Sequence, residues 1–156
     1  MKKLIFVAII LLNLNTKIIA SEIFGFAIIT DGDTIKISNK RIRLHGIDAP
    51  ERNQKCIKNE KEYSCGTAAT IALTKKISKN RVKCLVQENK DRYNRHIGVC
   101  FVKNEDINKW MVRNGYAIAY RQYSKDYISD EEHAKVNKLG LWSGIFLKPE
   151  KWRKLN

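Results

Sequence analysis

Short β-rich segments separated by turn residues fill the first half of the sequence, and they limit the folds open to the chain more than any other feature. Residues 23–37 are rich in β-branched and aromatic side chains and are interrupted once, at Asp31-Gly32. This pattern predicts two strands joined by a tight turn. Residues 41–45 alternate basic and apolar side chains, which predicts a third strand with its apolar residues on one face.

The remaining segments add helices and two more strands. The predicted elements are a helix over 66–78, strands over 81–87 and 97–102, and a helix over 106–114 with Gly115 as its C-cap. Ser129 and Glu132 match the S-x-x-E capping box, so a third helix is predicted to start at Ser129 and stop at Gly140. Five short strands with a helix after the third favour a five-stranded Greek-key barrel of the OB type, with about three helices.

The first twenty residues differ in character from the rest of the chain. Lys2 and Lys3 precede an apolar run over 4–12, and Ala20 lies just before Ser21. This pattern is typical of a secretory signal peptide, because the apolar run is shorter than the about 20 residues that span a bilayer; a buried first element is the alternative. We therefore expect a signal peptide over 1–20, a single domain over 21–156, export to a periplasm or to the medium, and no membrane association after cleavage.

The chain is strongly basic. Its formal net charge is +14, from 30 Lys and Arg against 16 Asp and Glu. Without the three lysines of residues 1–20 the charge falls to about +11, which favours a polyanionic partner. Nucleic acid, an anionic membrane and an anionic glycan all fit, and so does a basic surface that only keeps the protein soluble.

Four cysteines lie in the expected mature part: Cys56, Cys65, Cys84 and Cys100. An even number in an exported protein favours two disulfides, for which three connectivities exist. Cys84 and Cys100 are equidistant from Arg92, in the middle of a turn-like segment, so a hairpin there would place them opposite each other. We therefore predict Cys84–Cys100 and Cys56–Cys65, the second closing a lysine-rich loop. A zinc site is disfavoured because the chain has no C-x-x-C.

Acidic residues gather in two turns. Asp33 follows the first turn at the start of a strand, where an acid has poor strand propensity. The segment Asp48-Ala49-Pro50-Glu51 is stiffened by its proline, which fixes the directions of both carboxylates and of the Ala49 carbonyl. Two carboxylates and a carbonyl suit a hard cation such as Ca²⁺, although two solvated turns would give the same pattern.

Arginines accompany these acids. Alternation places Arg41, Arg43 and His45 on the face opposite Ile42 and Leu44. The segment "DRYNR", residues 91–95, offers two more arginines on a hairpin loop. Two guanidinium groups converging on one phosphate would stabilise a phosphoryl-transfer transition state, and a carboxylate such as Glu51 could orient or deprotonate a water. A solvated turn is the alternative for "DRYNR".

Four motifs, taken together and in order, resemble the staphylococcal-nuclease-like (thermonuclease) family: "DGDTI", "RIRLHGIDAPE", "DRYNR" and "HAKVNKLGLWSG". The resemblance covers about residues 24–143. It implies an OB-fold barrel with three helices and a Ca²⁺-dependent phosphodiesterase that acts on DNA and RNA, cuts the 5′ P–O bond and leaves 3′-phosphate ends. It implies no stable protein partner, and nothing in the sequence requires more than a monomer.

The resemblance also implies roles for individual residues. The calcium ligands would be Asp33, Asp48 and the backbone carbonyl of Ala49, and the catalytic residues would be Arg43, Glu51 and Arg95. Substrate contacts would come from Tyr93, Arg92 and a base-stacking tyrosine, Tyr120 or Tyr123. Two positions depart from the family pattern. Ala49 replaces a threonine, a mild change if the ligand is the backbone carbonyl. Asn94 replaces a glycine, and asparagine is among the least costly replacements if that glycine has positive φ.

Two readings from other classes remain beside the nuclease. The same barrel could bind nucleic acid without cleaving it, or a secreted basic protein could bind an anionic glycan. A pure binder has no use for Asp33, Asp48 and Glu51 beside a polyanion, because without a metal these acids repel it. The sequence therefore predicts a nuclease with little sequence specificity that favours single strands, and a catalytically inactive binding module is the alternative.

Overall fold

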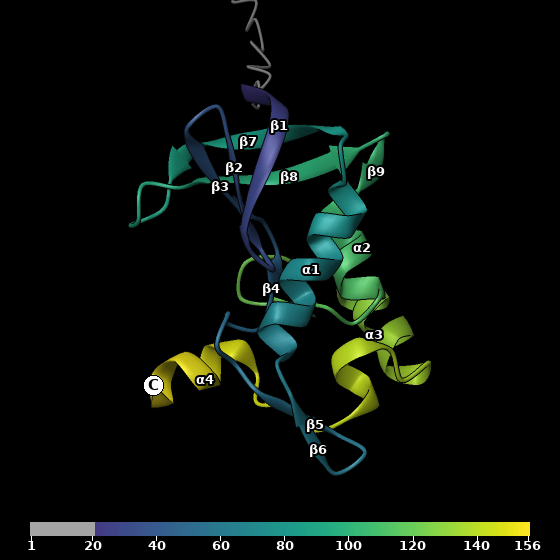
Figure 1. Ribbon diagram of the computed structural model, residues 1–156. Helices are drawn as coiled ribbons and strands as arrows, with labels where there is room; N and C mark the ends of the chain where they lie inside the picture. The colour runs from purple at the N-terminus through teal and green to yellow at the C-terminus, as the bar shows by residue number, and fades with distance from the viewer. Residues whose placement is uncertain (1–20) are drawn as a thin grey trace, which may run out of the picture.

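The computed structural model describes residues 21–156, so the predicted signal peptide lies outside the described residues. Five strands form a closed barrel: β1 (Ser21–Asp31), β2 (Thr34–Ile37), β3 (Lys40–Leu44), β7 (Arg81–Lys90) and β8 (His96–Val102). They pair in the order β3-β2-β1-β7-β8, and a parallel β3–β8 pairing closes the barrel. Figure 1 shows this barrel as one end of the molecule. The predicted five-stranded barrel of the OB type is confirmed.

Short strands extend the barrel and connect it to the other end of the molecule. These are β4 (Ile47–Asp48), β5 (Cys56–Lys58), β6 (Lys61–Tyr63), β9 (Glu105–Asp106) and β10 (Ile118–Ala119). β4 pairs with β10, and β5 with β6 forms a hairpin where only a loop was predicted. Charged side chains dominate that hairpin, so its sequence carries no alternation of apolar and polar residues.

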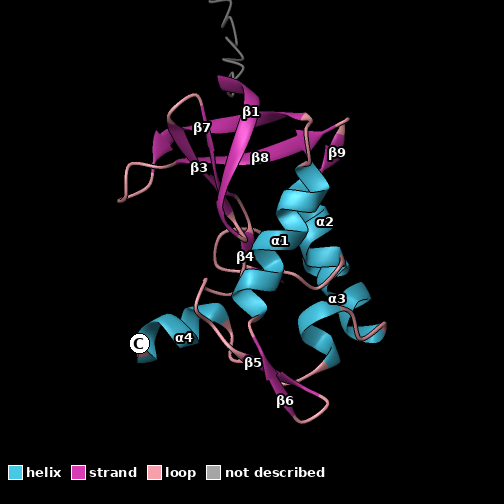
Figure 2. Cartoon of the chain, viewed as in Figure 1, coloured by secondary structure: helices cyan, strands magenta, loops and turns pink. Residues whose placement is uncertain are grey.

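Residues 21–156 also form four α-helices and one 3₁₀-helix: α1 (Cys65–Ile77), α2 (Ile107–Arg113), α3 (Ile128–Val136), η1 (Gly140–Ser143) and α4 (Pro149–Leu155). Figure 2 shows α1, α2 and α3 grouped on one side, with α4 standing apart from them. Three helices were predicted near these positions, and α4 was not. Within residues 21–156, no helix is long and apolar enough to span a membrane.

The core lies where the barrel meets the helices. Ile35 and Ile37 on β2 and Ile42 and Leu44 on β3 are fully buried, as the predicted alternation requires. Side chains of α1 and α2, among them Leu73, pack against them in the same cluster. The neighbouring basic residues of β3 are therefore turned outward.

The two predicted boundaries of the helix over 106–114 are confirmed in part, and the two predicted for the helix over 129–140 are wrong. Asp106 caps α2 by accepting a hydrogen bond from the Lys109 amide, and Gly115 follows with φ +72°, where a Cβ would overlap the Leu139 carbonyl. The Ser129 capping box is wrong, because Ser129 lies inside α3, which starts one residue earlier. That helix also ends at Val136 rather than at Gly140.

Both predicted disulfides are present. Cys84 and Cys100 lie directly opposite each other on β7 and β8, inside the barrel. Cys56–Cys65 joins the start of β5 to the start of α1 and is buried in a second, small apolar cluster. This bridge fixes the segment that follows Glu51 against the helix that packs on it.

Candidate active site

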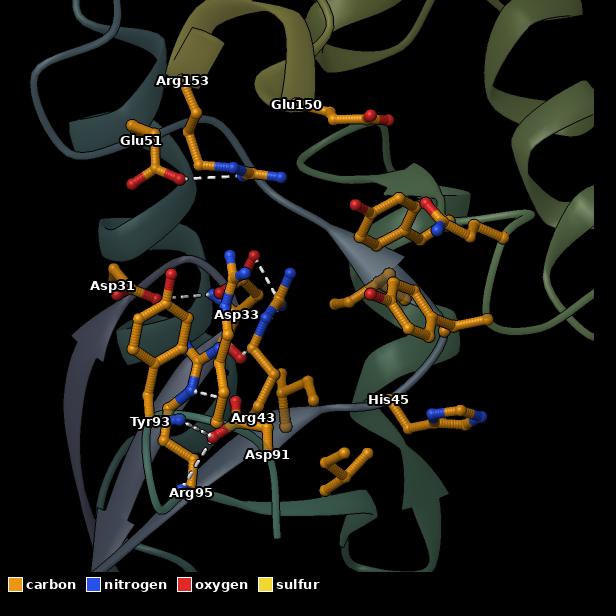
Figure 3. A pocket seen from close by; sticks show the side chains of 18 of the residues that line it. Asp31, Asp33, Arg43, His45, Glu51, Asp91, Tyr93, Arg95, Glu150 and Arg153 are labelled. Atoms are coloured by element: carbon orange, nitrogen blue, oxygen red, sulfur yellow. Dashed lines mark hydrogen bonds and ion pairs between the residues drawn. The ribbon is translucent and has the colours of Figure 1, made fainter. Parts of the chain in front are cut away.

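A large cleft of about 1120 Å³ opens between the barrel and α4. Figure 3 shows carboxylates and guanidinium groups gathered in it from several separate segments. Most of the predicted site residues line it: Asp33, Arg43, Glu51, Arg92, Tyr93, Arg95, Tyr120 and Tyr123. Asp48 and Ala49 lie buried directly behind its wall. The fold therefore brings the predicted residues together.

The β1–β2 turn supplies two carboxylates. Asp31 Oδ1 accepts a hydrogen bond from the Asp33 amide at 3.1 Å, which holds the turn in shape. Gly32, predicted as a turn glycine, does not have positive φ. It is needed for space instead, because a Cβ there would lie 2.7 Å from the Ala49 Cβ and 2.9 Å from the Ala69 Cβ. The turn can therefore press against Ala49.

Arg43 links the acids of the two turns. Its Nη1 lies 2.6 Å from Asp33 Oδ2, and its Nη2 donates to Asp48 Oδ1 at 3.1 Å. Asp33 Oδ2 also accepts a hydrogen bond from the Ala49 amide at 2.9 Å. One guanidinium thus holds both predicted metal-binding aspartates, and its side chain is mostly buried.

The clustered acids repel one another. Burial, followed by the charge of Asp33, raises the pKa of Asp31 to about 6. Burial also raises the pKa of Asp48, against the opposing hydrogen bonds and charge of Arg153. Burial therefore disfavours the ionised forms of these two carboxylates, and nearby positive charge stabilises them.

The position of Glu51 is fixed by contacts of its backbone. Its amide donates to the side chain of Gln54 at 3.2 Å, and Gln54 is fully buried and donates in turn to the Leu147 carbonyl at 2.7 Å. Gly66, in the first turn of α1, packs so closely that a Cβ there would overlap the Glu51 carbonyl oxygen. The Glu51 carboxylate itself reaches into the cleft and remains partly exposed.

Arg153, on α4, is a site residue that sequence reasoning missed. Its guanidinium meets both oxygens of Asp48, at 2.9 and 3.1 Å, and Glu51 Oε1 at 2.8 Å. Figure 3 shows the Arg153 guanidinium beside the Glu51 carboxylate. About one hundred residues separate it from both acids in sequence, so no local spacing signals the contact.

The β7–β8 loop supplies the second predicted arginine. Asp91 accepts from the Arg95 side chain at 2.7 Å and from the amides of Tyr93 and Arg95 at 2.9 Å. Burial would raise the pKa of Asp91, but these bonds and the charge of Arg95 outweigh it and lower the pKa. Asn94 has φ +60°, the conformation expected at this position.

Aromatic rings flank the acids and arginines. The Tyr93 ring is more than half exposed and lies 4.9 Å from the Arg92 guanidinium and 5.2 Å from that of Arg95. Tyr120 and Tyr123 meet edge to face at 4.8 Å, and Tyr123 is the more exposed. Both candidate stacking tyrosines therefore line the same cleft.

The predicted metal ligands, Asp33, Asp48 and the Ala49 carbonyl, suit a hard divalent cation chemically, because they offer only carboxylate and carbonyl oxygens. Among residues 21–156, however, no three acidic, His or Cys side chains surround a common point. Guanidinium groups of Arg43 and Arg153 already contact the Asp48 oxygens. A cation at Asp48 therefore requires Arg153 to move away.

Comparison with known proteins points to one family. Residues 41–144 match the model of the staphylococcal nuclease homologue family. A Rhizobium meliloti protein, "Succinoglycan biosynthesis protein ExoI", is 36% identical over 126 residues, which are 79% of this chain and 66% of that protein. An uncharacterized endonuclease of Haemophilus influenzae is 34% identical over 134 residues (81% and 70%), and a micrococcal nuclease of Shigella flexneri is 33% identical over 144 (81% and 77%).

Proposed function

The chain belongs to the family of staphylococcal nuclease homologues, and we propose that it is a Ca²⁺-dependent endonuclease that hydrolyses DNA and RNA with little sequence specificity. In this proposal it cuts the 5′ P–O bond and leaves 3′-phosphate ends. The observation that supports it most is that Asp33, Glu51, Arg43 and Arg95 line one cleft of a strongly basic protein, with Asp48 buried behind the cleft wall and bound to Arg43.

The two arginines bind the scissile phosphate. Arg43 comes from a barrel strand and Arg95 from a hairpin loop, and each is held by an aspartate, at 2.6 and 2.7 Å. Guanidinium groups fixed in this way can neutralise the charge that develops on the phosphate without having to reorganise. Glu51 accepts a proton from the attacking water or orients it, since its carboxylate lines the cleft and is more exposed than those of Asp33 and Asp48.

A calcium ion would be held by Asp33, Asp48 and the Ala49 carbonyl. It would supply positive charge beside the phosphate as a Lewis acid. The geometry supports this assignment, because the Ala49 amide donates to Asp33 Oδ2 at 2.9 Å and Arg43 contacts both Asp33 and Asp48, so the three residues lie together.

In this proposal the tyrosines position the substrate along the cleft. Tyr93 carries the exposed ring beside the two loop arginines and would contact a terminal phosphate, with Arg92 beside it. Of the two candidate stacking residues, we assign base stacking to Tyr123, because Tyr120 is partly covered by its neighbour's ring. Stacking tolerates any base, which suits a nuclease that favours single strands.

The remaining parts of the proposal concern the setting of the enzyme. We propose that it acts as a monomer, exported to a periplasm or to the medium after removal of residues 1–20. The two disulfides support export, because such bonds persist in oxidising compartments.

A digestion assay tests the proposal. The purified protein should degrade single-stranded DNA and RNA with Ca²⁺, stop when the ion is chelated, and leave products whose 3′ ends carry phosphate. Binding of nucleic acid with no cleavage under any of these conditions would instead establish the inactive binding module. A protein that binds neither DNA nor RNA would instead favour the reading in which its partner is an anionic glycan.

A further inference from the structure

The outer face of β1 exposes three large apolar side chains in a row. Phe24, Phe26 and Ile28 are 53%, 64% and 69% exposed and alternate with residues that face the barrel. Single exposed apolar side chains are common, but three neighbours on one strand form a contiguous patch, which marks a contact surface. None of the three lines the cleft.

Basic side chains border this apolar row on both sides. In the sheet register Phe24 faces Lys83 and Phe26 faces Arg81 on β7, while Ile28 faces Lys36 on β2. Residues directly opposite each other share a face of the sheet, so these cations stand beside the rings.

The Arg81 guanidinium confirms this arrangement, since it lies 5.6 Å from the Phe24 ring centroid and 5.4 Å from that of Phe26. One acid, Glu22, lies at the far end of the row. Its Oε2 lies 3.5 Å from Lys83 Nζ, and both side chains are about half exposed.

The patch is continuous with the cleft. Lys36 faces Arg41 on β3, and Arg41 lines the cleft two residues before Arg43. A cross-strand row from Ile28 through Lys36 to Arg41 therefore joins the exposed rings to the phosphate-binding arginine. Figure 1 shows β1 running along the outside of the barrel toward the end where β4 lies.

We propose that this face, made of Phe24, Phe26, Ile28, Lys36, Arg41, Arg81 and Lys83, is a second binding surface for single-stranded nucleic acid, which rests on the proposed nuclease function and extends it. Bases stack on the two phenylalanine rings, and the phosphates lie against the basic side chains, the combination typical of surfaces that bind single strands.

The spacing of the rings selects single strands. Side chains two residues apart on a strand are separated by roughly 6.6 Å. Successive bases in a stacked strand are only about 3.4 Å apart. Two neighbouring bases can therefore use both rings only when they are unstacked from each other, which a duplex does not allow.

This surface acts on long substrates. A strand held on β1 and crossing Lys36 and Arg41 enters the cleft from one side, so the surface lowers KM for long single strands and leaves kcat unchanged. A substrate of a few nucleotides cannot reach from the cleft to β1 and gains nothing from it.

The test uses the double variant Phe24→Ser/Phe26→Ser and, as a matched control, Ile71→Ser/Val136→Ser, which changes exposed apolar residues on α1 and α3. Affinity for a labelled oligodeoxythymidine of about twenty nucleotides is measured by fluorescence anisotropy in chelator, so that no cleavage intervenes. We expect the first variant to bind about ten-fold or more weakly, the control to bind like the wild type, and both to melt like the wild type.

Equal binding of the oligonucleotide by the Phe24/Phe26 variant and the wild type would overturn the proposal. So would loss of binding to phosphatidylserine-containing vesicles with unchanged oligonucleotide affinity, which would make the patch a membrane contact. Because binding is measured without cleavage, the proposed surface and the proposed nuclease activity are tested separately. A protein that binds the oligonucleotide through the two rings but never cleaves it would support the surface and contradict only the nuclease activity.

Discussion

Asp48 is fully buried, yet both of its carboxylate oxygens contact guanidinium groups. Arg43, on a neighbouring strand, contacts one oxygen and is itself largely enclosed. Arg153 contacts both from a short C-terminal helix and is about one third exposed. Of the two, Arg153 is the one that can leave without disturbing the barrel, and its guanidinium competes with any cation for Asp48.

Replacing Arg153 should therefore strengthen metal binding. The apparent affinity for an ion is reduced by the fraction of molecules in which its ligands are already occupied. For Arg153→Ala we expect roughly five-fold or more tighter Ca²⁺ binding in titration calorimetry. Lys154→Ala, which removes a neighbouring exposed cation paired with Glu150, is the control and should match the wild type. Weaker binding by Arg153→Ala would show that this arginine supports the metal site instead.

Asp91 positions Arg95, and its pKa gives that role a pH signature. Its pKa is lowered in the fold, so its bonds to Arg95 add stability above the unfolded pKa, and this stability is lost as pH falls through the lower folded value. Asp91→Asn should reduce kcat/KM by about 10- to 100-fold, because Arg95 loses the ion pair that directs it. In melting experiments its destabilisation should be full at pH 7 and shrink below about pH 4. If Asp91→Asn lowered the melting temperature by the same amount at every pH, the loss of stability would have a cause other than the charge of Asp91.

At the scale of elements, α1 determines where Glu51 lies. Gly66 sits in the first turn of this helix, where alanine would ordinarily be favoured by about 1 kcal/mol. A Cβ there would overlap the backbone of Glu51, so the helix and the Asp48–Glu51 segment can meet only at a glycine.

Gly66→Ala should therefore destabilise the protein by about 1–3 kcal/mol and lower kcat as Glu51 is displaced. Chemical denaturation and steady-state kinetics measure the two effects. Thr67→Ala, at the next and exposed position of the same helix, is the control. A Gly66 variant as stable and active as the wild type would show that the close contact has no role.

The elements also show how far the sequence could predict the fold. The barrel strands were readable because Ile35, Ile37, Ile42 and Leu44 alternate with outward residues, and alternation reports directly on burial. Helix α4 was not readable, since its seven residues hold only two large apolar side chains, Trp152 and Leu155, too few to establish a helical period. Ser129 shows the opposite error. Its capping box predicts a helix start, but Ser129 lies inside α3, whose N-cap is Tyr127 and has no side-chain capping bond.

The residues of the candidate site also fall into two groups, those that the sequence predicts and those that it does not. Asp33, Arg43, Glu51 and Arg95 were predicted because each lies in a short motif of its own turn or strand. Gln54, Gly66 and Arg153 were missed, because each acts through a contact with a distant segment and belongs to no local pattern.

At the scale of the whole molecule, the two disulfides close loops of different length in different parts of the fold. Cys84–Cys100 closes a separation of 16 residues inside the barrel, and Cys56–Cys65 one of 9 beside a small cluster. Replacing Cys84 and Cys100 by alanine should cost about 2–4 kcal/mol of unfolding free energy. The corresponding change at Cys56 and Cys65 should cost less, and urea unfolding compares the two. A larger loss at Cys56 and Cys65 would contradict this ranking.

The central claim for the whole molecule is that its cleft hydrolyses phosphodiesters with arginine-held carboxylates. The most direct measurement is the rate of single-strand cleavage by Arg43→Ala in saturating Ca²⁺. Arg113→Ala, which removes an arginine paired with a buried aspartate outside the cleft, is the control. We predict that kcat falls about 10²- to 10³-fold for Arg43→Ala and stays at the wild-type value for the control, with both variants folded. Equal cleavage by Arg43→Ala and the wild-type protein would contradict the account.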